Sequence, residues 1–248
     1  MKNWKIYSYL LLTYVVMQIG SVYLSKFVIG YLQSKPDLTE LQATYHGLAW
    51  SLFIVNTIAA IIFLLLLVPN KKFMNVFKGK KSTIGMTILW GFIGFFLAMA
   101  GQMIAGIIEQ AMGITVGSKN TEILGDIARM SSIIILPMVL FAPFLEELIF
   151  RRVIFGGIYL KTNFWIATIV SAVVFAAVHN EFQHLLMYMM PAFAFAFVYY
   201  KTKRILAPML AHLLMNGFVT IMQLNLDKIQ KYLQQFEDMK QTFIIFFN

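Results

Sequence analysis

Four side chains in the second half of the sequence are of the kinds that hydrolyse an amide bond: Glu146, His179, His212 and Asn216. A carboxylate can take a proton from water, and imidazole and carboxamide N–H groups can donate to the oxyanion that forms on the attacked carbonyl. All four lie in long apolar stretches, where an ionisable group costs roughly 2.5–3.5 kcal/mol on insertion scales and usually has a partner or a function. Their types and placement predict a hydrolytic site inside a membrane.

Two further charges lie beside the first of these residues. Glu147 and Arg151 are four positions apart, so on a helix they share one face and can neutralise each other as a structural ion pair. Glu146 points about 100° away and has no such partner in its own helix. An unpaired acid in lipid is hard to explain structurally, which favours a chemical role for Glu146.

The same atoms allow a second kind of site. Glu146, His179 and His212 could be three ligands of a zinc ion that keeps one open position. The sequence has no His-Glu-x-x-His helix and no cysteine, so thiolate sites are excluded and zinc is not the default. The residues alone leave a metal-free glutamate mechanism and a zinc mechanism both open.

Composition indicates the elements that must position these groups. Of 248 residues, 60% are hydrophobic and only 12% are charged, whereas a soluble domain carries about 25% charged residues. Several apolar runs reach the length of about 20 residues that crosses the hydrocarbon core. We therefore expect an all-α, polytopic transmembrane bundle of seven to eight helices with an intramembrane active site. The seven expected spans are 7–31, 48–69, 83–112, 131–160, 164–180, 185–200 and 205–224.

Helix geometry brings the four groups to a similar depth. Glu146 precedes the expected turn near Thr162 by 16 residues and His179 follows it by 17, so both lie about 24–26 Å from that turn. His212 and Asn216 follow the next turn on the same side, near Lys203, and lie about 14–20 Å along their span. Tilt can absorb the difference, so one acid, two imidazoles and one amide can meet.

The loops give an orientation and a location. The formal charge is +9, and the basic residues gather in alternate loops: Lys2 and Lys5, the run from Lys71 to Lys81, Lys161, and Lys201 to Arg204. Lys and Arg mark the cytoplasmic side, so we expect a multi-pass plasma-membrane protein with a cytoplasmic N-terminus. The same rule explains the basic charge without nucleic acid.

The remaining polar segments are expected outside the site. Glu109 is expected in an extracytoplasmic loop, His46 in a loop, and His184 in a loop or at the interface. Residues 113–130 are expected to form a polar connector, with a substrate lid as the alternative. The stretch after 225 could lie in the interface or form an eighth helix.

The motifs resemble those of the CAAX-protease and bacteriocin-processing family, also called the Abi family. The resemblance rests on Glu146-Glu147-x-x-x-Arg151, Phe175-x-x-x-His179 and His212-x-x-x-Asn216, and it covers about residues 130–220. It implies an intramembrane endopeptidase in which Glu146 activates water and His179 positions that water. His212 and Asn216 would stabilise the oxyanion, with Glu147, Arg151 and Phe175 in support.

The sequence departs from the family pattern in two places. Ala192, Ala194 and Ala196 stand where many members have glycines, so looser helix packing is expected there, and Arg152 stands where the residue is often small.

These inferences define three regions: N-terminal helices and loop (1–128), catalytic helices (129–224) and a tail or eighth helix (225–248). The expected substrate is a small membrane-associated peptide or protein precursor, as in peptide maturation, signal-peptide or pheromone processing, or bacteriocin self-immunity. No cofactor is expected, with zinc as the open alternative, and the partners are the substrate and the bilayer, not nucleic acid. The alternatives are a non-catalytic scaffold or immunity protein that binds a peptide with the same fold, and a transporter or proton relay. The relay would need polar groups strung across the membrane.

Overall fold

The computed structural model describes residues 3–115 and 117–247, and every regular element within them is a helix. Six helical segments are long and apolar enough to cross a membrane, and a shorter apolar helix of 14 residues lies among them. They are α1 (Asn3–Gln33), α2 (Glu40–Leu67), α3 (Ile84–Ala111), the segment Ser132–Tyr159, the short α7 (Phe164–Ala177), α8 (Leu185–Thr202) and α9 (Leu206–Leu224). The predicted polytopic helical bundle is confirmed.

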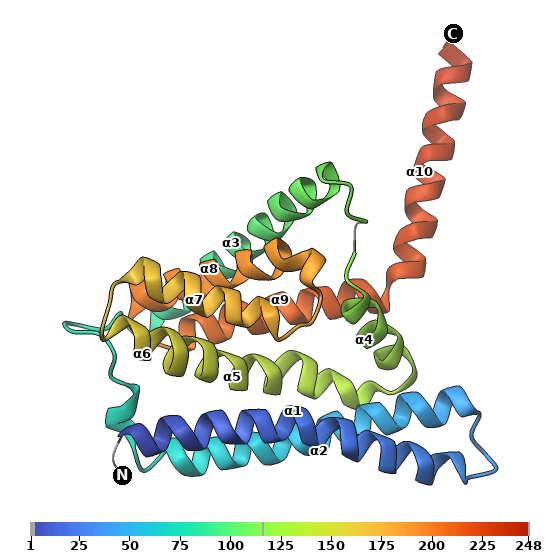
Figure 1. Ribbon diagram of the computed structural model, residues 1–248. Helices are drawn as coiled ribbons and strands as arrows, with labels where there is room; N and C mark the ends of the chain where they lie inside the picture. Colours follow the sequence, from blue (N-terminus) through green and yellow to red (C-terminus); the bar gives the residue numbers. More distant parts are fainter. Residues whose placement is uncertain (1–2, 116, 248) are drawn as a thin grey trace.

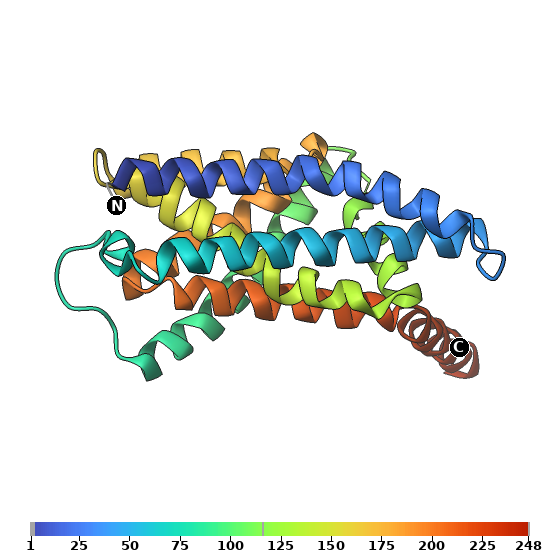
Figure 2. The same ribbon diagram turned by 90° about the horizontal axis from the view of Figure 1, so that it is seen from below.

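The helices form two groups around the segment Ser132–Tyr159. On one side α1 and α2 make an antiparallel hairpin, and on the other α3 packs against α8 and α9 (Figures 1 and 2). The described basic loops lie at the end of the bundle where α1 begins, together with the short helix η1 (Lys71–Met74). Lys2 lies outside the described residues. The α1–α2 connection and the end of α9 lie at the opposite end.

The segment Ser132–Tyr159 departs from the regular α-helix expected over 131–160. It contains a 3₁₀ turn, η2 (Ser132–Ile134), and two π-helical stretches, η3 (Pro137–Phe141) and η4 (Glu147–Phe155), and these alternate with α5 (Ala142–Glu146) and α6 (Gly156–Tyr159). In the π register the Ala142 N–H bonds to the Pro137 carbonyl, so the next acceptor is the Met138 carbonyl. Its donor would be residue 143, which is a proline without an N–H. The Met138 carbonyl, nine residues before Glu147, therefore has no backbone donor in this register.

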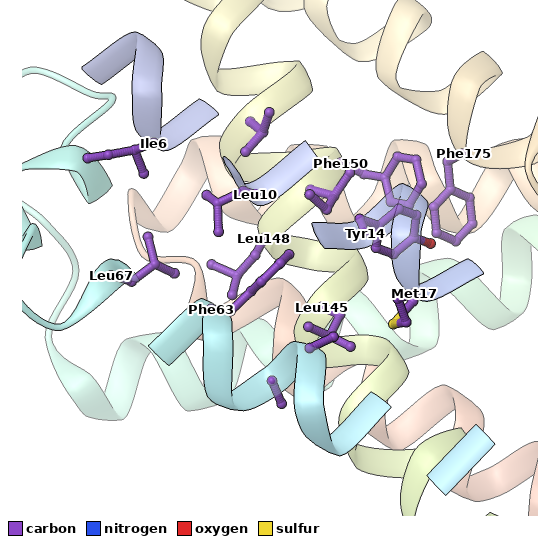
Figure 3. Packing of buried hydrophobic residues seen from close by; sticks show 14 of the residues in the cluster. Ile6, Leu10, Tyr14, Met17, Phe63, Leu67, Leu145, Leu148, Phe150 and Phe175 are labelled. Carbon is purple, nitrogen blue, oxygen red and sulfur yellow. The ribbon is translucent and has the colours of Figure 1, made fainter. Parts of the chain in front are cut away.

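A buried hydrophobic stripe fixes α1 against this segment. Ile6, Leu10, Tyr14 and Met17 repeat at helical spacing and pack with Phe63, Leu145, Leu148 and Phe150 (Figure 3). The rest of α1 is largely exposed apolar surface, as expected of a helix that faces lipid.

Arg152, which departs from the family pattern, holds the bundle at its basic end. Its Nε donates to the Phe73 carbonyl at 2.6 Å, its Nη2 donates to the same oxygen, and its Nη1 donates to the Tyr7 hydroxyl at 2.8 Å. The guanidinium also lies 3.8 Å from the centre of the Phe73 ring. A charge that looked out of place in the sequence thus joins α1, η1 and η4.

Three placements expected from the sequence are wrong. Glu109 lies in the last turn of α3, and His184 lies in the short helix η5 (Phe182–His184); both are buried, and the carboxylate accepts from His184 Nδ1 at 2.8 Å. A charged group next to a polar loop looked exposed, but its partner is 75 positions away. His46 lies inside α2, which begins eight residues earlier than the expected span.

Two segments outside the spans are also helical. Residues 119–130, expected as a connector or lid, form α4 (Lys119–Met130), which is capped by Ser118 and packs on α2 and α9. Val116 of the expected connector lies outside the described residues. After α9, the helix α10 (Leu226–Phe247) leaves the bundle at a steep angle and is not among the membrane-spanning candidates (Figure 1). This placement favours the interfacial alternative over an eighth span.

Close packing around α8 is provided by glycines of α3. Ala192, Ala194 and Ala196 are buried, so the looser packing expected there is wrong. A Cβ on Gly94 would lie 3.0 Å from the Ala211 Cβ and 3.1 Å from a Val198 methyl carbon. The small residue that lets these helices approach is therefore on the neighbouring helix.

The Gly94→Val substitution should lower stability by about 1–3 kcal/mol, because the added carbons overpack the contact with Ala211 and Val198. Thermal unfolding in detergent measures this as a lowered midpoint. The matched control is Gly106→Val on the same helix, where a Cβ would meet nothing within 4 Å. Equal midpoints for the two variants would contradict the packing account.

Candidate active site

The four side chains picked out in the sequence line one cavity of about 340 Å³. Glu146 reaches it from the end of α5, His179 from the turn after α7, and His212 and Asn216 from α9. The helices therefore bring together an acid, two imidazoles and a carboxamide that the chain separates by up to 70 residues.

Glu147 connects the cluster. Its Oε1 accepts from His212 Nδ1 at 2.9 Å, its Oε2 lies 3.1 Å from Arg151 Nε, and its side chain is fully buried. His212 Nε2 lies 3.7 Å from Glu146 Oε2, which is too long for a direct hydrogen bond. The imidazole thus lies between two carboxylates, fixed by Glu147 and facing Glu146. The i,i+4 pair of Glu147 with Arg151 could be anticipated, but the bond to His212 could not.

Arg151 is buried in an aromatic shell. Its guanidinium lies 5.0 Å from the centre of the Phe175 ring and 5.4 Å from that of Phe195. The 3.1 Å approach to Glu147 is an ion pair without hydrogen-bond alignment, and within the described residues the guanidinium N–H groups have no acceptor. Its charge is therefore balanced by one carboxylate and two ring faces. Phe175 also packs on His179 and His212 with ring centres 4.9 and 6.0 Å apart, which accounts for its place in the second motif.

His179 lies just beyond the helix on which it was expected. The helix α7 ends at Ala177, and His179 Nδ1 lies 2.8 Å from the Phe175 carbonyl oxygen. Because a carbonyl can only accept, Nδ1 carries the proton and Nε2 is the free ring nitrogen. The ring stacks on Tyr188 with centres 4.1 Å apart. These contacts fix both the orientation and the tautomer of His179.

Asn216 uses half of its donor capacity on the backbone. Its Nδ2 donates to the Met138 carbonyl at 2.9 Å, which is the carbonyl that Pro143 cannot satisfy in the π register. The second N–H of the amide is available to another acceptor in the cavity. Asn216 therefore supplies the hydrogen bond that Pro143, 73 positions earlier, cannot make.

A second polar cluster adjoins the cavity and was missed by the sequence analysis. Glu181 accepts from the Asn120 backbone N–H at 2.9 Å and from the Tyr188 hydroxyl at 2.7 Å, and Ser118 Oγ lies 2.9 Å from the same hydroxyl. Burial alone would raise the pKa of Glu181, but the polar contacts with Ser118, Tyr188 and Asn120 lower it below its ordinary value. Glu181 therefore ties the start of α4 to the residue that stacks on His179. The only hint of this in the sequence is that Glu181 lies two positions after His179.

The residues proposed as zinc ligands were checked as a set. Within the described residues, no group of three His, Cys, Asp or Glu side chains is placed to hold a metal ion. His212 Nδ1 is bonded to Glu147 and His179 Nδ1 to a backbone carbonyl, which leaves Nε2 free on both rings, as in histidines that bind metals. The nitrogens themselves are therefore suited to a metal, but the three ligands are not gathered around one point in the described residues, and no step is derived through a metal.

The helical bundle, with ionisable side chains gathered in a cavity between its spans, defines a multi-pass membrane protein. Residues 128–218 match the family described as type II CAAX prenyl endopeptidase Rce1-like. The chain is 40% identical over 247 residues to a Bacillus subtilis (strain 168) protein named "Putative membrane peptidase YdiL", with 97% of each chain covered. It is 38% identical over 184 residues to the "Membrane-embedded CAAX protease MroQ" of Staphylococcus aureus (strain USA300), covering 71% of this chain and 73% of that protein. No solved structure matches the chain. The chain belongs to the Rce1-like CAAX-protease family, and the resemblance found in the motifs is confirmed.

The Glu147→Gln substitution should destabilise the protein by about 3–5 kcal/mol, because it leaves the buried Arg151 cation without its carboxylate. Thermal unfolding in detergent is the measurement. Glu147→Gln combined with Arg151→Met should recover a large part of the loss, since the unpaired charge is gone. If the double variant is no more stable than Glu147→Gln alone, the loss of stability does not come from the unpaired charge of Arg151.

The Glu181→Gln substitution should loosen α4 at neutral pH. A lowered folded-state pKa means that the carboxylate stabilises the fold above its ordinary pKa, and this contribution is lost as pH falls through the folded value. Hydrogen exchange of the α4 amides should therefore be faster in the variant at pH 7, with the difference shrinking below pH of about 4. Glu122→Gln, at an exposed position of the same helix, is the control. A difference that grows on acidification would contradict this assignment.

Proposed function

We propose that the protein is an intramembrane endopeptidase that hydrolyses a peptide bond in a small membrane-associated peptide or protein precursor by glutamate-activated water. The observation that carries the proposal is the juxtaposition of Glu146 with His212 Nε2, 3.7 Å apart, in the cavity that His179 and Asn216 also line. A base and several donors around one small space are what amide hydrolysis needs.

The reaction follows from which atoms are free. Glu146 takes a proton from water while the water oxygen attacks the peptide carbonyl, and the free Nε2 of His179 accepts from the same water and orients it. The second N–H of Asn216 donates to the oxygen that becomes negative, as does His212 Nε2 when that ring carries both protons. Collapse of the tetrahedral intermediate breaks the C–N bond, and Glu146 returns its proton to the leaving amine. The products are one new carboxylate and one new amine terminus.

Glu147, Arg151 and Phe175 act through other groups in this scheme. Glu147 holds the ring of His212, Arg151 balances Glu147, and Phe175 contacts both histidines. They are positioning residues, because none of them needs to touch the substrate.

Substrate class and orientation are part of the proposal. A site within membrane-spanning helices selects for substrates that reside in or on the bilayer, and relatives named as a membrane peptidase and a CAAX protease support peptide substrates. The basic loops lie at the end where α1 begins, which supports a cytoplasmic N-terminus in the plasma membrane.

The Glu146→Gln substitution should abolish cleavage, since a carboxamide cannot take a proton from water. We expect mass spectrometry of membrane-associated peptides to show precursors that are shortened in cells with the wild-type protein and intact in cells with Glu146→Gln. The exposed Glu122→Gln variant should process them normally. Full processing by Glu146→Gln would remove Glu146 as the base, and identical peptides in cells with and without the protein would favour a non-catalytic immunity protein.

We further propose that this reaction uses no metal. The purified protein should then cleave its precursor in detergent at an undiminished rate in the presence of a zinc chelator. Elemental analysis should find less than one zinc per chain. Loss of activity with the chelator and its recovery on adding zinc would restore the zinc alternative.

A further inference from the structure

The first helix contributes a polar group to the cavity that the family match, which begins at residue 128, leaves out. The buried face of α1 carries Ile6, Leu10, Tyr14 and Met17, and Tyr14 is its polar member. Its ring packs edge-on against Phe150 with centres 5.9 Å apart. A phenylalanine would fill that space equally well, so packing does not explain the hydroxyl.

The Tyr14 hydroxyl faces the cavity. Tyr14 lines the cavity together with Glu146. Within the described residues the Tyr14 hydroxyl makes no hydrogen bond. The Tyr199 hydroxyl also has no partner and is fully buried, whereas the Tyr14 hydroxyl keeps some exposed surface. Figure 3 shows the hydroxyl directed to the Phe175 end of the cluster. A hydroxyl in a membrane span that faces a cavity without a protein partner is free to bind what enters.

Two carboxamides extend this polar surface. Gln18 follows Tyr14 by one helical turn and lines the same cavity. Asn56 of α2 also lines it, and its Nδ2 donates to the Leu52 carbonyl at 2.8 Å, which leaves its Oδ1 as an acceptor. Tyr14 offers a hydroxyl donor, Gln18 an amide that can donate and accept, and Asn56 a carbonyl acceptor. Together they can pair with the alternating N–H and carbonyl groups of a peptide backbone. We call Tyr14, Gln18 and Asn56 the α1–α2 wall.

This wall lies across from the proposed catalytic donors. The segment Ser132–Tyr159 contacts α1 on one side and α9 on another, and both views place α1 and α9 apart (Figures 1 and 2). An extended peptide presents carbonyl and N–H groups along both edges, whereas a helix satisfies them internally. At about 340 Å³ the cavity is at the small end of ligand sites and has room for a short stretch of chain.

We propose that the α1–α2 wall is a substrate-binding subsite that holds an extended peptide by its backbone, with the Tyr14 hydroxyl donating to a substrate carbonyl on the edge opposite His212 and Asn216. This inference rests on the proposed peptidase function and names how the same site recognises its substrate. Because it binds the backbone, the subsite should accept substrates with different side chains. It requires, however, that the substrate be unfolded from a helix at the bound segment.

The test is the Tyr14→Phe substitution, which keeps the ring and removes one oxygen. The probe is a fluorophore–quencher peptide with ten residues on each side of the cleavage site found in the Glu146 comparison. Loss of one neutral hydrogen bond to substrate should raise KM by roughly 3- to 10-fold, with kcat within about twofold of wild type because ground and transition states lose the same contact. The control is Tyr9→Phe, at an exposed position of the same helix.

A second measurement keeps the two hypotheses separate. In the Glu146→Gln background, Tyr14→Phe should weaken binding of the uncleaved peptide by the same factor. Wild-type KM in Tyr14→Phe, while Glu146→Gln is inactive, would overturn this inference alone. A loss of kcat with unchanged KM would also overturn it, since the hydroxyl would then act on the reacting atoms. Cleavage by Glu146→Gln would instead refute Glu146 as the base in the proposed function, whatever Tyr14→Phe does.

Discussion

The bond between Glu147 and His212 is the contact on which the site depends. It joins η4 to α9 at a point buried from water, where a carboxylate can persist only if its charge is met. Arg151 supplies that charge from within the same helix, and the faces of Phe175 and Phe195 surround the guanidinium in turn. The orientation of the His212 imidazole therefore depends on Glu147, then on Arg151, and then on the two aromatic rings around the guanidinium. A substitution at any of these positions should shift His212 relative to Glu146, although only Glu147 contacts the imidazole through a hydrogen bond.

The irregular backbone of the fourth span has a physical role in the same arrangement. A continuous α-helix would satisfy its carbonyls within itself, but the π register and Pro143 leave the Met138 carbonyl to Asn216. The bond attaches α9 to this span a second time, on the other side of Glu146 from the Glu147–His212 contact. The span is held to α9 both before and after its acid, so the position of Glu146 relative to His212 and Asn216 is fixed by two cross-links and not by packing alone.

Much of this could be predicted from the sequence. The apolar runs determine the number of passes, and the spacing of Glu147 and Arg151 predicts their pair. Equal distances from the turns put Glu146 and His179 at one depth. Contacts between distant positions could not be predicted, because periodicity is local: Glu147 with His212, Glu109 with His184, and Glu181 with the start of α4. Residues 113–130 lie outside the spans as expected, but the helix within them was not foreseen, because its apolar residues, such as Ile127, pack on the distant α2. The ends of helices could not be predicted either: His179 was expected within its span but lies two residues past the end of α7.

The placement of α4 affects how the second reactant arrives. Each bond cut consumes one water molecule, and hydrocarbon holds almost none. Asn120 and Thr121 lie in the first turn of α4, which is no membrane-spanning helix, and both face the cavity that contains Glu146. They give the cavity a hydrophilic end on the side of the bundle away from the basic loops, while its flanks are bounded by spans. The cavity thus joins the polar end of the bundle to Glu146, so water need not cross the hydrocarbon to reach this carboxylate.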